Sequence, residues 1–383
     1  MKRVLLIGGT GVFGRRLARH LARHGPSMDL VVTSRSAARA EALAREIGAR
    51  GTALDTRADL AATLRSLHPF VVIDCSGPFQ GLDHGTARAA IEAGAHAVDL
   101  ADARDYLRGY GTALDGLARE HGVAALGGAS STPALSGAAA RALTEGWKRV
   151  DTLDFAITPG ARSEVGPAVL QAVLSYAGRP VPVWKGEAIG WSGGHKVEMP
   201  GLGPRRIAPV ETADAEWLGP LLGVRERVSF GAGLESAIEQ RGLEALAWFR
   251  ERGWIDDPAP VLPLLRAARR LTRITTSDRG GMALWASGSD ARGRAVRASW
   301  SLVATHDDGP QVPALAAAAA VRALLTDEID PGARLADEVL ALETILAEAA
   351  PYRIATRVRC EGAEEAIPDL IHSSPDPTPC PPC

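Results

Sequence analysis

The sequence has little cysteine, few aromatic residues and no surplus of charge. It holds four cysteines in 383 residues, with Cys75 apart from Cys360, Cys380 and Cys383, which is not the pattern of a disulfide framework. Its 43 Lys and Arg residues nearly balance its 45 Asp and Glu residues, so the charge indicates neither nucleic acid nor an anionic membrane as a partner. No apolar run reaches the length of a membrane span, and no apolar signal segment precedes the first strand, so we expect a cytoplasmic protein without a membrane span.

The sequence also lacks the motifs of serine and metal catalysis. It contains no G-x-S-x-G elbow and no H-E-x-x-H helix, and its histidines are scattered. The segment Cys380–Cys383 has C-x-x-C spacing, but it lacks two further ligands for zinc and the strand-helix setting of a redox motif. We therefore expect no metal, and the composition predicts a disordered tail over residues 361–383.

What the sequence does contain, in its first residues, is the pattern of a strand, a glycine turn and a helix. The apolar run Val4–Ile7 leads into Gly8–Gly14, and a helical pattern follows from Arg15. The glycines fit either of two spacings, one that starts at Gly9 and one that starts at Gly8. We favour the second because Gly8 directly follows the strand. Such a turn at a helix start cradles phosphate, so we predict a bound dinucleotide.

The end of the second predicted strand favours NADP over NAD. The strand Leu30–Thr33 is followed by Ser34 and Arg35, with no carboxylate there to accept hydrogen bonds from an unphosphorylated ribose. A guanidinium beside hydroxyl groups suits a 2′-phosphate, although Arg35 could instead stack on adenine or cap a loop. Asp55, after the third strand, either reaches the adenine or serves as a turn or helix-cap residue.

The first third of the chain alternates strands and helices, as a parallel doubly wound sheet requires. The predicted strands are Val4–Ile7, Leu30–Thr33, Gly51–Leu54, Val71–Asp74, Ala97–Leu100 and Val123–Leu126. The predicted helices are Arg15–His24, Ala37–Ile47, Ala58–Leu67, Gly85–Ala93 and Gly111–Glu120. In the middle region we expect a separate α/β layer, with a strand at Val150–Ile157, helices at Val165–Tyr176, Leu243–Arg250 and Val261–Leu271, and a hairpin of Met282–Ser287 and Ala295–Ala304 around Asp290–Gly293.

The fourth strand ends in a Gly-Pro turn at the carboxyl edge of the sheet, where ligands bind. The backbone of this turn can lie along the nicotinamide half of a dinucleotide, with Phe79 over the ring or the ribose. The alternative is an ordinary turn between a strand and a helix. The predicted cofactor-binding residues are Gly8, Gly9, Thr10, Gly11, Val12, Phe13, Gly14, Ser34, Arg35, Asp55, Ser76, Gly77, Pro78 and Phe79.

Four segments of the chain together resemble the saccharopine dehydrogenase-like family, in particular the bacterial proteins with a saccharopine dehydrogenase NADP-binding domain. They are Ile7–Gly14, Asp74–Gly81, Glu92–Asp102 and Gly127–Pro133, and the likeness continues more thinly at Ser277–Met282 and His306–Pro313. The chain departs from the family at Pro133-Ala134, where relatives often have Pro-Gly, and at His84, where an aromatic residue is common.

The resemblance implies a Rossmann-type doubly wound parallel sheet with an inserted α+β second domain and C-terminal helices that return to the Rossmann domain. The expected boundaries are 1–130, 131–311 and 312–360. It also implies an NADP-dependent oxidoreductase that transfers hydride to or from a C=N, C=O or activated C=C group of a small-molecule substrate. Family members act on amino acids, polyamine-related imines or lipid enoyl groups, so the resemblance leaves the substrate open. The other class of function is a non-catalytic NADP-binding sensor, and a homodimer is also left open.

Four side chains are candidates for acid-base chemistry, each with a structural alternative. Asp99 and Asp102 follow the fifth strand and could meet a substrate amine or relay a proton, or could be a cap and a surface residue. Tyr106 could donate a proton or be a packed tyrosine. His84 could act near neutral pH or simply end a helix.

Other residues could bind the substrate or an anion. Ser130–Thr132 precede Pro133 and could form either an anion-binding helix start or a plain cap. His195, Lys196 and Trp191 could line a substrate cleft. A carboxylated substrate calls for arginines such as Arg205, Arg206 or Arg279, whereas a lipid calls for an apolar groove such as the region of Trp184, Trp191 and Leu202.

Overall fold

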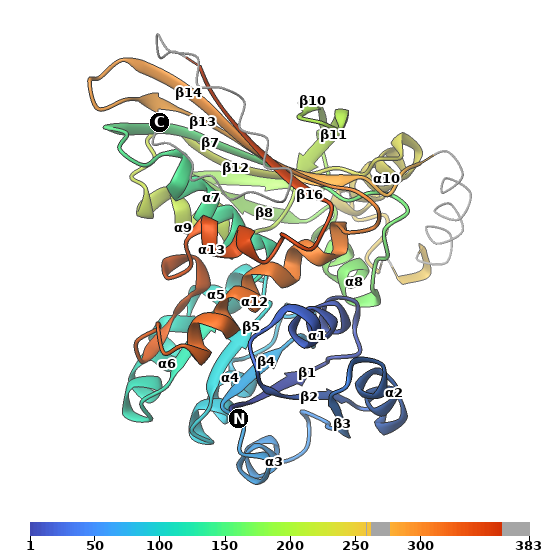
Figure 1. The fold of residues 1–383 in the computed structure, drawn as a ribbon. Coiled ribbons are helices and arrows are strands. Elements are labelled where there is room, and N and C mark those ends of the chain that lie inside the picture. Colours follow the sequence, from blue (N-terminus) through green and yellow to red (C-terminus); the bar gives the residue numbers. More distant parts are fainter. Residues whose placement is uncertain (258, 262–275, 362–383) are drawn as a thin grey trace. The chain divides into compact units, whose positions relative to one another are not determined.

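The computed structural model describes residues 1–257, 259–261 and 276–361, and it divides the chain into two compact units (Figure 1). The first unit joins Met1–Ala138 to Pro310–Ala349, and the second joins Ala139–Gly309 to the residues from Ala350 onward. Residues 362–383 of the predicted tail and residues 262–271 of the helix predicted over Val261–Leu271 lie outside the described residues.

The first unit is built on a sheet of seven parallel strands in the order β15-β6-β5-β4-β1-β2-β3. The strands are β1 (Arg3–Ile7), β2 (Asp29–Ser34), β3 (Arg50–Ala53), β4 (Val71–Asp74), β5 (His96–Asp99), β6 (Ala124–Gly127) and β15 (Gly332–Leu335). The helices of this unit are α1 (Val12–His24), α2 (Ala37–Ile47), α3 (Leu60–Leu67), α4 (Gly85–Glu92), α5 (Arg104–Arg108), α6 (Tyr110–Glu120), α12 (Val312–Leu325) and α13 (Leu342–Ala347). The strand order reverses between β1 and β4, which is the crevice where dinucleotides bind in such sheets.

Apolar runs explain why these strands form the centre of the unit. All residues of β4 and the last four of β1 are buried, as expected of parallel strands covered by helices on both faces. Helices α3, α4 and α6 pack in one layer, while α1 packs against α2 and α12 (Figure 1). The predicted Rossmann-type fold with an inserted second domain and returning C-terminal helices is confirmed.

Helix α12 is almost entirely buried because it is rich in alanine, whose small side chain allows close packing against α1. Proline in its first turn starts it without losing a needed hydrogen bond. A buried polar network also joins these elements, since His20 Nε2 lies 2.5 Å from Glu348 Oε2 and Arg322 donates to Glu348 Oε1 at 2.6 Å. Burial alone would raise the pKa of Glu348, but these two partners outweigh it and hold the pKa below its usual range.

The second unit is built on a mixed sheet of seven strands in the order β10-β11-β12-β7-β13-β14-β16 and a two-stranded sheet of β8 and β9. The strands are β7 (Arg149–Thr158), β8 (Pro180–Val183), β9 (Gly186–Ile189), β10 (His195–Met199), β11 (Gly203–Pro209), β12 (Arg227–Ala232), β13 (Gly280–Ser289), β14 (Ala295–Ala304) and β16 (Ile354–Glu361). The helices include α7 (Ser136–Leu143), which crosses the unit boundary, α8 (Pro167–Tyr176), α9 (Asp214–Leu221) and α10 (Ala237–Glu251). The hairpin of β13 and β14 confirms the one predicted around Asp290–Gly293.

Two parts of the sequence interpretation differ from this structure. Residues 354–361 form β16, which pairs with β14 in the second unit, whereas residues 312–360 were assigned to helices on the nucleotide domain. Strand β15, which extends the first sheet beyond β6, was not expected at all.

Among the described residues, no helix combines the length and apolarity that a membrane crossing needs.

Candidate functional site

The glycine turn after β1 is held directly against the chain that leaves β4. Gly8 has φ +68°, and a Cβ built on it would lie 2.8 Å from Ser76 Cα, so only glycine fits. Gly14 is equally constrained, because a Cβ there would lie 2.4 Å from Gly8 O. The requirement at Gly8 agrees with the spacing that starts at this residue.

Helix α1 begins at Val12, and no side chain caps the backbone N–H groups of its first turn. Gly11 N–H donates to Gly8 O at 2.9 Å to close the turn, and Gly11 as N-cap has no side chain to satisfy the first amides of the helix. Unsatisfied amides and the helix dipole favour a negatively charged group at this point. The cradle between Gly8 and Gly14 therefore fits a pyrophosphate.

The end of β2 is tied to the glycine turn through a pair of hydroxyls. Thr10 Oγ1 donates to Ser34 Oγ at 3.1 Å, and Ser36 N–H donates to the same oxygen at 3.3 Å. Arg35, between Ser34 and Ser36, is exposed. This arrangement holds Arg35 beside the turn as a cation with an accessible guanidinium, which is what a 2′-phosphate needs.

Asp55 forms a local ion pair with Arg57, which the sequence does not predict. Its carboxylate accepts from Arg57 Nε at 3.0 Å and from Arg57 Nη2 at 2.9 Å. These bonds, the backbone N–H of Arg57 and the nearby charge of Arg35 lower the pKa of Asp55 to about 2. Asp55 is thus a turn residue, and its reach toward an adenine stays a prediction.

The chain after β4 is braced by Asp74, a residue to which the sequence assigns no role. Asp74 Oδ1 accepts from Ser76 N–H at 2.8 Å and from Ser76 Oγ at 2.5 Å. Burial raises the pKa of Asp74, and hydrogen bonds from Ser76 and Thr86 offset only part of that rise. An Asp followed by Ser two residues later was the available sequence signal, since this pair forms an Asx turn. The brace fixes Ser76 where it meets Gly8.

Next to this turn lies an aromatic cluster that includes three predicted site residues. Phe79 is buried, and its ring centroid lies 5.3 Å from that of Tyr106. His84, the N-cap of α4, lies with Nε2 2.7 Å from Tyr106 O and packs its ring edge-on against Tyr106 and Tyr110. The Phe79 ring is therefore part of the packing, so a cofactor would meet the backbone of Gly77 and Pro78 here.

Asp99 is the most heavily bonded carboxylate of the site. Its Oδ1 accepts from Gly128 N–H at 2.9 Å and Ala101 N–H at 3.1 Å, and its Oδ2 accepts from Tyr106 Oη at 3.1 Å. Burial raises the pKa of Asp99 to about 6, and the neighbouring Asp74 adds to the rise despite these bonds. Burial and Asp99 together raise the pKa of Tyr106 strongly, which keeps its hydroxyl protonated.

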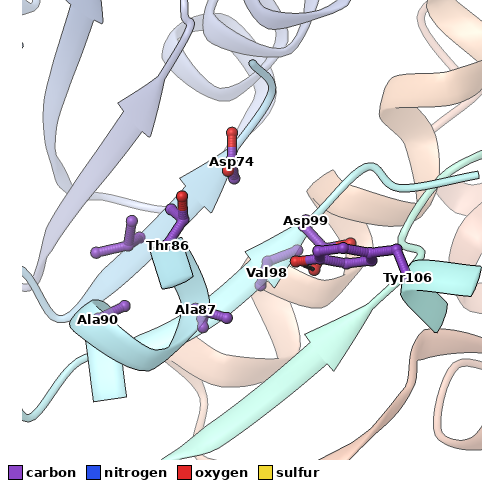
Figure 2. Close-up of a pocket in the computed structure, with 9 residues that line it drawn as sticks. Asp74, Thr86, Ala87, Ala90, Val98, Asp99 and Tyr106 are labelled. Carbon is purple, nitrogen blue, oxygen red and sulfur yellow. Dashed lines mark hydrogen bonds between the residues drawn. The ribbon is translucent and has the colours of Figure 1, made fainter. Parts of the chain in front are cut away.

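A small cavity lies between the two buried carboxylates and α4. Figure 2 shows Thr86 of α4 beside Asp74, and Tyr106 with its ring against Asp99. The cavity is lined by Val72, Asp74, Thr86, Ala87, Ala90, Ala97, Val98, Asp99 and Tyr106. Among the described residues no group of three or more His, Cys, Asp or Glu side chains could hold a metal ion.

Asp102 differs from the other three catalytic candidates because it is exposed. Its carboxylate accepts a long hydrogen bond from Gln80 Nε2 at 3.5 Å. Desolvation by the surrounding protein raises the pKa of Asp102, and this bond together with the backbone N–H of Asp102 itself offsets only part of the rise. Asp99 and Tyr106 are buried, and His84 is half-buried. Asp102 is therefore the candidate whose carboxylate a ligand can reach.

The residues before Pro133, for which the sequence allows either an anion-binding helix start or a plain cap, take a different local form. Ser131–Leu135 form a π-helical turn, Thr132 is extended and Ser130 is buried, and no side chain caps the turn. Backbone bonds hold the preceding residues, because Ala129 N–H donates to Asp99 O.

The candidates in the second unit are spread over several elements. Arg205 and Arg206 are consecutive on β11, so their side chains point to opposite faces of the sheet. Arg206 is paired with Glu244, while Arg279 donates to Gly201 O. These arginines do not form the convergent pair expected for a carboxylated substrate.

The other second-unit candidates also lie on separate elements. Trp191 is buried, whereas His195 and Lys196 lie exposed on β10. Leu202 packs against a core cluster that includes Met199 and Ile207. The grouping of Trp184, Trp191 and Leu202 as a lipid groove stays a prediction.

Comparisons with known proteins agree with this geometry. Residues 4–126 match the family model described as the saccharopine dehydrogenase NADP binding domain. The resemblance to the saccharopine dehydrogenase-like family that the sequence predicts is therefore confirmed over these residues. No curated protein matches the chain.

Solved structures resemble the chain over most of its length. Saccharopine dehydrogenase (L-Glu forming) from Saccharomyces cerevisiae aligns with a TM-score of 0.65 and 14% identity, covering 94% of this chain and 100% of that one. An engineered D-amino acid dehydrogenase bound to NADP+ aligns with a TM-score of 0.49 and 16% identity, over 90% of this chain and 95% of that one. A mutant meso-dapdh with DAP from Clostridium tetani E88 aligns with a TM-score of 0.49 and 12% identity, covering 90% of this chain and 96% of that one. The likeness to the yeast enzyme shows the same fold.

Proposed function

We propose that this protein is an NADP-dependent oxidoreductase that transfers hydride to or from a C=N, C=O or activated C=C group of a small molecule. The observation that carries the proposal is the backbone contact between Gly8 and Ser76 at the point where the strand order reverses. A dinucleotide crosses such a sheet at this point, with its pyrophosphate on the helix that follows the first strand.

The chain's own residues divide the work of holding the cofactor. The amides from Val12 to Gly14 bind the pyrophosphate, and Arg35 with Ser34 binds the 2′-phosphate of the adenosine ribose. The backbone of Gly77 and Pro78 orients the nicotinamide half, which supplies or accepts the hydride when bound. Asp74 acts as a positioning residue, because its bonds to Ser76 set the course of that backbone.

Of the four acid-base candidates, we assign proton transfer to Asp102. It is exposed, and the bond that it accepts from Gln80 is long, so its carboxylate can accept a proton from a substrate amine or hydroxyl, or return one. The Tyr106 hydroxyl already donates to Asp99, and His84 already meets Tyr106 O. We therefore assign positioning roles to Asp99, Tyr106 and His84.

Cofactor titration tests the first half of the proposal. We expect NADPH to bind more tightly than NADH, and R35A to weaken NADPH by about 100-fold with little effect on NADH, because a charged contact to phosphate is lost. The matched control is R45A, which removes an exposed arginine near the other end of α2. Equal losses for both cofactors in R35A would contradict the assignment.

Turnover tests the second half. NADPH oxidation is followed with a panel of imines, keto acids and enoyl thioesters, and the substrate class that supports oxidation identifies the acceptor group. Tight NADPH binding without oxidation by any member of the panel would contradict the enzyme and favour a non-catalytic sensor of NADPH.

A further inference from the structure

The chain segments that leave β2 and β3 lie side by side at the edge of the first sheet. Ser34 and Ala53 are register partners in parallel strands, and Leu54 N–H donates to Ser34 O at 2.9 Å. Arg35 follows the first of these strands and Asp55 the second. A phosphate bound to Arg35 would therefore also feel the charge on Asp55.

An unpaired carboxylate at this position would oppose a phosphate. Two unit charges 4 Å apart interact by about 1 kcal/mol even in water, and a phosphate monoester carries nearly two negative charges at neutral pH. Asp55 is ionised throughout the neutral range, since its pKa lies near 2. The chain thus sets a repelling group next to the cation that would select NADP.

Arg57 forms an ion pair with the Asp55 carboxylate. Its guanidinium binds both carboxylate oxygens of Asp55, and its backbone N–H donates to Asp55 Oδ1 at 3.1 Å. A guanidinium has five N–H groups, and the pair uses two of them. The Arg57 side chain is 77% exposed, so the rest of its guanidinium is open to a ligand.

We propose that Arg57 is a specificity-determining residue for NADP. It cancels the charge of Asp55, which would otherwise repel a 2′-phosphate bound to Arg35, and its remaining N–H groups are open to that phosphate. This inference rests on the proposed cofactor, and it adds a residue that the glycine turn and the end of β2 do not reveal.

The test compares the dissociation constants of NADPH and NADH for the parent, R57A, the double variant D55A/R57A and the control R65A. Arg65 is exposed in the last turn of α3, and within the described part of the chain it forms no ion pair. We expect R57A to weaken NADPH about tenfold and NADH less than twofold, because only NADPH carries the phosphate that Asp55 then repels. The double variant removes both charges, so NADPH affinity returns to within about threefold of the parent. R65A leaves both constants unchanged.

The outcomes separate this inference from the proposed function. A parent that prefers NADPH and loses the preference in R35A but keeps it in R57A would overturn the role of Arg57 and leave the oxidoreductase proposal standing. A double variant as weak as R57A would overturn the charge-cancelling role. A parent that binds neither cofactor would overturn both proposals. Thermal melting of each variant checks that it is folded.

Discussion

Four aspartates end or follow strands of the first sheet, and they fall into two contrasting pairs. The inner pair, Asp74 and Asp99, are register partners on β4 and β5, and both are buried. The outer pair, Asp55 and Asp102, lie beyond the ends of β3 and β5, and both have substantial exposure.

The partners of each pair explain the difference. The inner carboxylates accept backbone N–H groups of Ser76, Ala101 and Gly128, so they hold three chain segments in place. The outer carboxylates accept from the side chains of an arginine and a glutamine, and the backbone N–H that Asp55 accepts comes from Arg57, only two residues further on. The same residue type thus builds the framework at the centre of the edge and leaves accessible carboxylates at its rim.

The largest difference in stability between the inner and the outer pair is expected when the aspartates are replaced by alanine, with D99A as the severe case. It leaves the N–H groups of Ala101 and Gly128 and the Tyr106 hydroxyl without their acceptor, so we expect a loss of about 4 kcal/mol in the free energy of unfolding, measured by urea denaturation at pH 7.5. The matched change at the rim, D102A, is expected to cost less than about 0.5 kcal/mol. Equal losses in the two variants would erase the distinction between the pairs.

A smaller effect is expected on the pH dependence of the free energy of unfolding, to which the buried Asp99 contributes. Because the pKa of Asp99 is raised to about 6 in the folded protein, its stabilising contribution is full below pH 3.8 and is lost as the pH rises through 6. From pH 5 to pH 7.5 the parent should lose about 1 kcal/mol relative to D99N, which cannot titrate. Parallel stability curves for the two proteins would mean that Asp99 does not hold its proton in this way.

The smallest effect on stability, and a large one on chemistry, is expected from D102N. The exposed side chain should leave the free energy of unfolding within about 0.5 kcal/mol of the parent, while kcat falls about 100-fold because an amide cannot take a proton. Both are measured on one preparation, with the substrate found in the turnover panel. An unchanged kcat would remove Asp102 from proton transfer.

The first six strands of the first unit could be predicted because each carries its own local signal. An apolar run ends in glycine or a polar turn at β1, β2 and β4, and no predicted strand boundary differs from the observed one by more than one residue. Strand β15 reads Gly-Ala-Arg-Leu, with no apolar run, and its place depends on pairing with β6 about two hundred residues earlier in the chain. Such long-range pairing has no local pattern.

The second sheet was harder for a related reason. Strands β10 and β11 are short and carry charged residues, so their alternation is weak. In contrast, β16 alternates Ile354, Thr356, Val358 and Cys360, a readable signal that the expected return of helices obscured.

The part of the candidate site that the sequence predicts is the course of its backbone. The glycines at the two turns require particular chain geometry, and geometry of this kind is encoded locally. The partners of Asp55, Asp74 and Asp99 are set by which turn folds toward which carboxylate. Arg57 lies only two residues from Asp55, yet nothing in the sequence says that its side chain folds back.

The return of residues 310–349 to the first unit has a consequence for how the protein is made. Strand β15 and helix α12 leave the ribosome only after the whole of residues 139–309. Until then β6 is an open sheet edge, and the face of α1 that packs on α12 has no cover. The nascent chain must therefore carry an unfinished domain through the synthesis of another, and during that interval it depends on chaperones or on the speed of translation more than the finished protein does.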